Sequence, residues 1–228
     1  MHRDALATVV LAAVFCFGGS GAVMAEADAD AGVALPPPIR SGGTSVEDAL
    51  ARRRSVRAYA DAPLRLAAVS QLVWAAQGIT DPDGLRTAPS AGALYPLEVY
   101  LVAGSVTGLR SGVYRYDPRR HRLLLHAAGD PRKALSDAAL EQEWVAEAPV
   151  VLVLAAVYER SAHKYGERAP RYVHIEVGHA AQNVYLQAVA LELGTVMVGA
   201  FHDRALKEVL RLPSEVEPLG VMPVGKPR

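Results

Sequence analysis

Basic side chains are concentrated in one short stretch near the start of the expected folded region. Four arginines and a serine lie close together there: Arg52, Arg53, Arg54, Ser55 and Arg57. Arginine forks pair bidentately with phosphate oxygens, and a serine hydroxyl supplies one more donor. The stretch therefore predicts a site for a phosphorylated ligand. The alternative is a solvated basic helix end, because positive charge is favourable at a helix C-terminus.

Three further segments combine glycine with small or basic residues and could border a ligand. They are residues 89–92 in a small-residue loop, residues 199–200 after a short apolar stretch, and residues 225–228 at the end of the chain. Small residues let backbone N–H groups approach a flat ring closely. Each segment taken singly is also typical of an ordinary turn.

A long helix is expected from Tyr172 to Leu193, between these segments. Its polar residues recur at steps of three, four and four, at Glu176, His179, Asn183 and Gln187. This spacing traces one narrow stripe on a helix. A helix of this length spans roughly 33 Å, so we expect it to be covered on several sides. Gly178 near its middle predicts a close approach, either by the core or by a second copy of the chain.

The other elements mix strands and helices without a regular alternation. Helices are expected over 46–54, 66–77, 131–148 and 203–210, strands over 97–103, 149–158 and 218–225, and a hairpin over 112–125. The unbroken apolar run over 149–158 is typical of a strand buried on both faces. The irregular order favours the α+β class over a doubly wound sheet.

The N-terminal region has the pattern of a targeting segment followed by a linker. Residues 1–25 combine an apolar run with a small-residue cleavage site, which predicts a signal peptide and an exported, periplasmic or secreted protein. An uncleaved membrane anchor is the alternative, although the run is short for a membrane span. Residues 26–44 alternate acids with alanine and then become proline-rich, which predicts a disordered linker. The folded domain is expected over 45–228.

Composition excludes several classes of function. The 24 basic and 24 acidic residues balance, so there is no excess charge for a nucleic-acid partner. Cys16, the only cysteine, lies in the N-terminal apolar run, which leaves the domain without a thiol nucleophile or disulfide. His174 and His179 are about 140° apart around a helix and do not converge, so we expect no metal site.

Five segments, in order, resemble the nitroreductase-like flavoproteins and, among them, the SagB-type dehydrogenases related to azoline oxidases. The segments read RRRSVRAY, APSAGALYPLEVY, HKYGERAPRYVHIEVGHAAQNVYLQAVALELG, VGAF and GKPR. The resemblance covers residues 46–228. It implies a nitroreductase-like α+β fold with a mixed, mainly antiparallel sheet flanked by helices. It also implies a homodimer with FMN at an interface formed largely by the long helix.

The resemblance further implies which residues hold FMN. Those matched to its phosphate are Arg53, Arg54, Ser55, Arg57, Lys226 and Arg228. Those matched to its ring and ribityl chain are Pro89, Ser90, Ala91 and Gly92, while Gly199 and Ala200 would direct an N–H at the flavin N5. A donor at N5 stabilises the reduced ring.

Lys164 and Tyr165 match the pair that azoline-oxidising members use to deprotonate substrate carbon as hydride leaves. Consecutive side chains can face one flavin only from an irregular segment, which Gly166 and Pro170 permit. The alternative for the pair is an ordinary exposed loop.

We therefore expect an FMN-dependent oxidoreductase that transfers hydride between flavin N5 and a small or peptide-like organic substrate. One alternative is a nitro- or quinone reductase supplied by NAD(P)H. A second is a flavin-binding protein without turnover. The expected export signal distinguishes this chain from cytosolic peptide-maturation enzymes.

Overall fold

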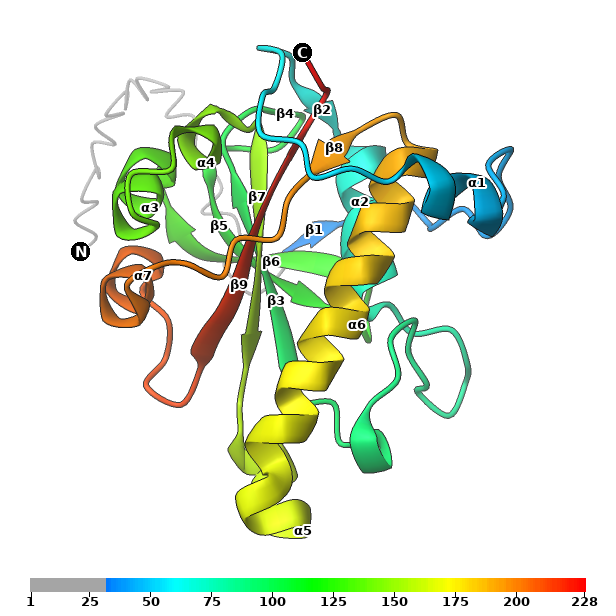
Figure 1. The fold of residues 1–228 in the computed structure, drawn as a ribbon, viewed down its shortest axis with the longest axis vertical. Coiled ribbons are helices and arrows are strands. Elements are labelled where there is room, and N and C mark those ends of the chain that lie inside the picture. The colour runs from blue at the N-terminus through cyan, green and yellow to red at the C-terminus, as the bar shows by residue number, and fades with distance from the viewer. Residues whose placement is uncertain (1–31) are drawn as a thin grey trace, which may run out of the picture.

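A seven-stranded antiparallel sheet forms the middle layer of residues 32–228, the part of the chain that this computed structural model describes (Figure 1). Its strand order is β1-β6-β5-β3-β7-β9-β8. The strands are β1 (Val33–Ala34), β3 (Leu97–Ala103), β5 (Gly112–Asp117), β6 (Arg122–Ala128), β7 (Val150–Ala156), β8 (Gly194–Thr195) and β9 (Glu217–Gly225). A separate parallel pair joins β2 (Leu64–Arg65) to β4 (Val106–Thr107).

Helices cover both faces of this sheet. They are α1 (Val46–Arg52), α2 (Leu66–Gln77), α3 (Arg132–Ala138), α4 (Glu143–Glu147), α5 (Glu159–Tyr165), α6 (Ala169–Ala190) and α7 (Asp203–Leu210), with short 3-10 turns at Ala91–Ala93 and Gly166–Arg168. The antiparallel sheet with flanking helices confirms the α+β class. None of the helices in the described residues is long and apolar enough to cross a membrane.

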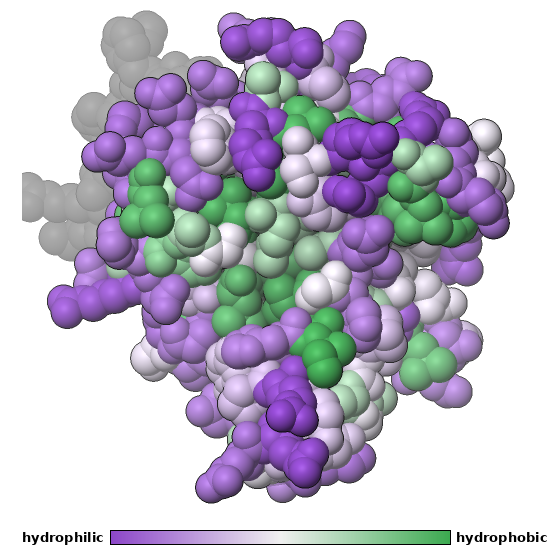
Figure 2. All heavy atoms as spheres, viewed as in Figure 1, coloured by the Kyte–Doolittle hydropathy of each residue, from purple (hydrophilic) through white to green (hydrophobic). Residues whose placement is uncertain are grey.

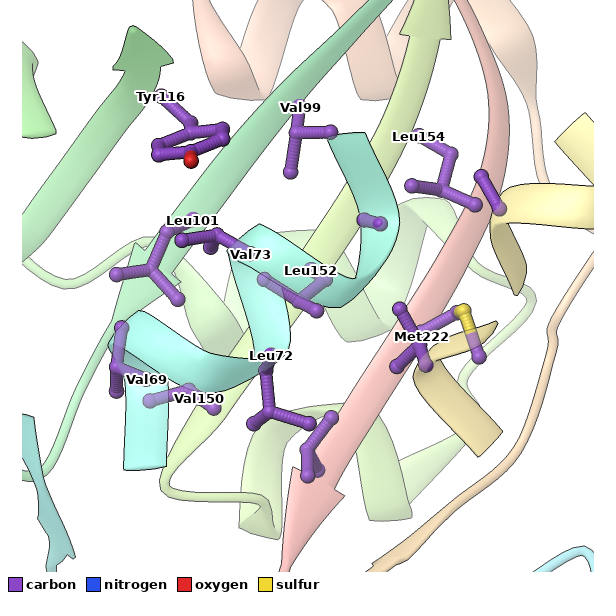
Figure 3. Close-up of a cluster of buried hydrophobic side chains, with 14 of the residues drawn as sticks. Val69, Leu72, Val73, Val99, Leu101, Tyr116, Val150, Leu152, Leu154 and Met222 are labelled. Atoms are coloured by element: carbon purple, nitrogen blue, oxygen red, sulfur yellow. The ribbon is translucent and has the colours of Figure 1, made fainter. Parts of the chain in front are cut away.

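Two hydrophobic cores lie on opposite faces of the sheet, because side chains alternate along each strand. Leu152 and Leu154 of β7 belong to the core under α2 and α6, whereas Val151 and Val153 belong to the core under α3, α4 and α7. Figure 3 shows Leu72 of α2 among strand side chains of the first core. Every residue of β7 is buried, which confirms a strand covered on both faces.

The single helix expected over 131–148 is wrong. The structure has two short helices, α3 and α4, separated by Leu140 and Glu141, which both have φ of 58°. Two consecutive left-handed residues end a right-handed helix. By contrast, α2 and α7 have the expected bounds, and Ser45 caps α1 by accepting a hydrogen bond from Asp48 N at 3.1 Å.

Part of the expected linker is packed against the domain. Val33 pairs with Leu123 of β6, Leu35 is buried, and the Ile39 N–H donates to the Gln71 side chain at 2.8 Å. The prediction of a disordered linker is therefore wrong for residues 33–39, because composition alone does not reveal partners elsewhere in the chain. The expected signal peptide, residues 1–25, and linker residues 26–31 lie outside the described residues, so these two assignments stay predictions.

Three of the four residues in the polar stripe of α6 form hydrogen bonds to a loop or to the neighbouring helix α2. The Asn183 side chain donates to Thr87 O at 3.1 Å, and Gln187 accepts from Gln71 of α2 at 3.1 Å. Glu176 accepts from the Ala91 N–H at 2.9 Å. The fourth member, His179, is exposed. Glu176 and Asn183 thus fix the loop that leads into β3, and Gln187 joins α6 to α2.

Glu176 is a buried carboxyl group, only 3% exposed. Burial raises its pKa above the ordinary value of 4.5, and hydrogen bonds from Ala91 N–H and Ser90 oppose that shift. Positive charge at His179 and Arg86 opposes it too. The raised pKa means that the folded state holds this proton more tightly than the unfolded chain does.

We predict that Glu176→Gln changes how stability depends on pH. In the wild type, the folded state binds more protons than the unfolded state between pH 4.5 and the raised pKa, so stability falls as pH rises through that window. Glutamine removes this loss while its amide oxygen can still accept from Ala91 N–H. The stability of the variant relative to wild type should therefore increase with pH.

Urea unfolding at a series of pH values measures this difference. A stability difference between Glu176→Gln and wild type that stays constant from pH 4 to neutrality, to within about 0.3 kcal/mol, would contradict a raised pKa. A difference of opposite slope would show that the folded state favours the ionised carboxylate instead.

Candidate functional site

The segment after α1 and the C-terminal residues lie side by side, although they are at opposite ends of the domain (Figure 1). Tyr59 forms an antiparallel bridge with Pro227. The Ala60 N–H donates to Lys226 O at 2.9 Å, and the Arg228 N–H donates to Ala58 O at 3.2 Å. These contacts bring the arginine-rich stretch next to the two basic residues of the C-terminus.

Buried contacts hold this segment in place. The Tyr59 hydroxyl lies 2.7 Å from Val56 O and 3.1 Å from Pro223 O of β9, and burial raises the pKa of this phenol. Val56 N–H donates to Thr195 O of β8 at 2.9 Å. A Cβ on Gly194 would lie 2.6 Å from Val56, so glycine is required there for the close approach.

Tyr185 of α6 contacts two residues of the arginine-rich stretch, Arg53 and Ser55. The Arg53 guanidinium lies over its ring, 5.0 Å from the centroid, and its hydroxyl is 3.3 Å from Ser55 Oγ. The same hydroxyl accepts from Met197 N–H at 2.7 Å. The sequence offered no signal for Tyr185, because its partner Ser55 is 130 positions away in the chain.

Most of the positive charges of this region have no acidic partner among the described residues. Arg52 pairs with Asp48 at 2.7 Å. No carboxylate in residues 32–228 lies within 4.0 Å of the side-chain nitrogens of Arg53, Arg54, Arg57, Lys226 or Arg228. Figure 2 shows strongly hydrophilic residues gathered over the end of α1 and the C-terminus. We call Arg53, Arg54, Ser55, Arg57, Lys226 and Arg228 the basic set.

A cavity of about 380 Å³ opens beside the basic set. Arg54 and Pro227 form part of its wall, and Tyr185, Ala188 and Val189 of α6 form another part. A polar rim over an apolar helix face suits a ligand with an anionic end and an apolar body. Glu192 also lines this cavity, and the phosphorylated ligand that the arginines predict stays a prediction.

The loop over residues 89–92 lies further along α6, against its N-terminal half. Gly92 has φ of 62°, and a Cβ there would lie 2.7 Å from both Lys164 Nζ and Tyr165 Oη. Glycine therefore removes a strained conformation and also leaves room for both side-chain ends. We call Pro89, Ser90, Ala91, Gly92, Lys164 and Tyr165 the loop set.

Lys164 and Tyr165 occupy the last turn of α5, so the expectation of an irregular segment is wrong. The helix ends at Gly166, which has φ of 51°. Both side chains nevertheless reach the same glycine. The Tyr165 ring packs edge-on against Tyr172 of α6, with centroids 4.8 Å apart.

Gly199 and Ala200 form an exposed turn after the bridge between Val198 and Val221. Ala200 O accepts from the Gln142 side chain at 2.9 Å. A Cβ on Gly199 would meet no atom of the described residues within 4 Å. This turn therefore has open space on the side of Gly199, and its role in binding a flavin stays a prediction.

One chain brings residues together within each set but keeps the two sets apart. The basic set contacts Tyr185 and the loop set contacts Glu176, and these two residues of α6 are roughly 14 Å apart along the helix at about 1.5 Å per residue. The Gly199–Ala200 turn lies nearer the basic set. Gln142, the residue before α4, donates to Ala200 O, and Trp144 of α4 lies against the Arg57 guanidinium.

The chain matches known proteins over this whole region. A protein of Methanocaldococcus jannaschii named as a nitroreductase is 50% identical over 181 residues, covering 79% of this chain and 90% of that protein. The trifolitoxin-processing protein of Rhizobium leguminosarum bv. trifolii is 31% identical over 137 residues, or 58% of this chain and 37% of that protein. The microcin B17-processing protein of Escherichia coli is 27% identical over 173 residues, or 71% of this chain and 62% of that protein.

A solved structure and a family model agree with these relatives. The crystal structure of a nitroreductase from Ralstonia eutropha JMP134 superposes with a TM-score of 0.77 at 30% identity, covering 88% of this chain and 91% of that one. The match confirms the nitroreductase-like fold. The model of the nitroreductase family matches residues 50–226, which include nearly all residues of both sets. The chain belongs to the nitroreductase family.

Proposed function

We propose that this nitroreductase-family protein is an FMN-dependent oxidoreductase of the SagB-type branch, acting on a small or peptide-like organic substrate. The observation that carries the proposal is the meeting of unneutralised basic side chains from both ends of the domain. Two relatives named for trifolitoxin and microcin B17 processing support a peptide-like substrate. The relative named as a nitroreductase favours the alternative of a nitro- or quinone reductase supplied by NAD(P)H.

The residues of the site fit FMN chemically. The basic set offers guanidinium forks, an ammonium group and a hydroxyl to a dianionic phosphate. The exposed N–H groups of the Gly199–Ala200 turn suit a ring nitrogen that gains charge. FMN, when bound, supplies reversible hydride transfer at its N5 atom.

Lys164 and Tyr165 would handle the proton of the same reaction. Their Nζ and Oη atoms meet at Gly92, an exposed residue of the loop set, where a substrate carbon can approach. One of these atoms would accept a proton from the substrate while the hydride passes to the flavin, so both the proton and the hydride have an acceptor. A positioned acid or base of this kind contributes about 10²–10⁴-fold to a rate.

We further propose that two chains complete each site, with the basic set of one chain facing the loop set of the other. The outward face of α6 supports this arrangement, because Ile175 is 50% exposed and Gly178 has open space at its Cα. Among residues 32–228, no neighbouring atom lies within 4 Å of a Cβ placed on Gly178, so of the two close approaches that the sequence left open, the structure leaves room for the one by a second copy of the chain. A second α6 could pack against it closely.

The dimer proposal predicts that the purified protein has twice the mass of one chain by light scattering. Gly178→Leu should shift it toward monomer, because the larger side chain obstructs close helix packing. Ala190→Leu, at an exposed position near the end of α6, is the matched control. A monomeric protein that retains bound flavin would contradict the shared site.

For the cofactor, we predict that the purified protein is yellow and releases FMN on heating, identified by its mass. Arg54→Gln combined with Lys226→Gln should weaken FMN binding at least roughly tenfold, since each hydrogen bond to a charged group contributes about 1.5–3 kcal/mol. Flavin fluorescence during titration of the apoprotein measures the affinity.

Arg204→Gln is the control for loss of a surface arginine away from the basic set, because Arg204 is exposed on α7 and pairs there with Glu208. This variant should bind FMN as the wild type does. A colourless protein that also fails to bind added FMN would exclude the proposed cofactor. Bound FMN without turnover on any substrate would support the alternative of a flavin-binding protein.

For the proton-handling pair, we predict that Lys164→Met lowers the rate of flavin reduction by an azoline-containing peptide at least roughly a hundredfold. The flavin content should stay that of wild type, because Lys164 is outside the basic set. Stopped-flow absorbance measures the rate.

Reduction by NADPH followed by a nitroaromatic or a quinone serves as the comparison, because hydride transfer from NADPH needs no proton acceptor at Lys164. Equal losses in both assays would contradict a role in proton transfer. A wild type that reacts only with NADPH would favour the nitro- or quinone reductase.

A further inference from the structure

A second arginine-lined cavity lies outside both sets. It has a volume of about 420 Å³ and is bordered by the end of α2, the loop before β3, the β5–β6 turn and the first turn of α5. The loop before β3 projects at the lower right of Figure 1, in blue-green. The charged residues of its lining are Arg86, Glu98, Arg115, Asp117, Arg119 and Arg160.

The two acidic residues of the lining neutralise only part of this positive charge. Glu98 lies 3.6 Å from Arg115 and also pairs with Arg160. Asp117 accepts from the backbone N–H of Arg119 at 2.9 Å, and its carboxylate is 4.0 Å from the Arg120 side chain.

Two guanidinium groups are left without an acidic partner. Within residues 32–228, no carboxylate lies within 4.0 Å of the side chains of Arg86 or Arg119. Arg119 is exposed at the β5–β6 turn, whereas Arg86 is partly buried. The cavity wall thus carries a net positive charge, with one partly buried and one exposed arginine that have no acidic partner among the described residues.

Neutral groups hold Arg86 in a defined orientation. One of its terminal nitrogens donates to Gln77 Oε1 at 2.8 Å, and its guanidinium stacks over the Tyr95 ring, 4.4 Å from the centroid. Its Nε is buried and has no hydrogen-bond partner within the described part of the chain. A partly buried, oriented charge that lacks a counter-ion is costly unless an anion compensates it.

We propose that this cavity binds a small oxyanion, with carboxylate or phosphate oxygens, between Arg86 and Arg119. Arginine forks suit both chemistries because both present paired oxygens. The site is distinct from the basic set, since it is formed by other segments of the chain. It does not depend on the proposed function.

The cavity is also linked to the loop set through the backbone. Ala93 and Tyr95 line it, and they directly follow residues 89–92. Ser90 Oγ accepts from the Tyr95 N–H at 2.9 Å, which joins the two parts of the loop. An anion bound at Arg86 would therefore restrict the loop that carries Gly92.

The test compares two neighbouring arginines of the same turn. Inorganic phosphate and succinate are titrated separately into the full chain by calorimetry, with any bound flavin retained and its content measured. Arg119→Gln should weaken binding of at least one of them roughly tenfold. Arg120→Gln removes the same charge next to the cavity without removing a lining residue, and should change affinity by less than about twofold.

Arg86→Lys provides a second variant, which keeps the charge but removes the planar fork. It should also weaken binding, with an unfolding midpoint that shows the protein is still folded. Binding of neither anion would overturn the proposal, and so would equal losses in Arg119→Gln and Arg120→Gln. Binding that is weakened only by Arg54→Gln would assign the anion to the basic set and overturn it as well. Flavin content that is unchanged in Arg119→Gln separates this result from that of the cofactor proposal.

Discussion

The β-type contact between residues 58–60 and 226–228 is the constraint on which the candidate site depends. Backbone hydrogen bonds there oblige two basic segments to lie side by side although like charges repel. The buried Tyr59 stabilises this pairing of segments, because its hydroxyl donates a hydrogen bond to Pro223 O of β9. The result is a patch of positive charge that has no acidic partner within residues 32–228, which is favourable once an anion binds.

Helix α6 sets the distance between the two halves of the site. Its C-terminal half supports the basic set through Tyr185, and its N-terminal half fixes the loop set through Glu176. Because a helix is stiff and packs against the sheet along its length, this separation cannot change without unpacking a core. The proposed site shared between two chains would bring both halves to one cofactor.

The protein contains two arginine-rich regions that differ in how their charges are held. The basic set is largely exposed and can accept a ligand from solvent with little reorganisation. In the cavity near β3, Glu98 pairs with Arg115 and Arg160, while Arg86 is held by Gln77 and Tyr95. We therefore expect the cavity near β3 to discriminate more strongly than the basic set between anions of different shape. Its net positive charge is also smaller.

The sequence alone determined the main elements and the identity of the basic segments. An unbroken apolar run predicted β7 and the regular spacing of polar residues predicted α6, because burial of whole faces leaves a pattern along the chain. Such patterns failed where partners lie far away in the sequence or where the backbone breaks locally, as at residues 33–39 and at Leu140 with Glu141. Only the tertiary structure revealed that Glu176 and Asn183 of α6 hold a loop, that Tyr185 contacts Ser55, and that Arg86 has no acidic partner among the described residues. These contacts join residues distant in the chain, so their geometry follows from packing and not from local pattern.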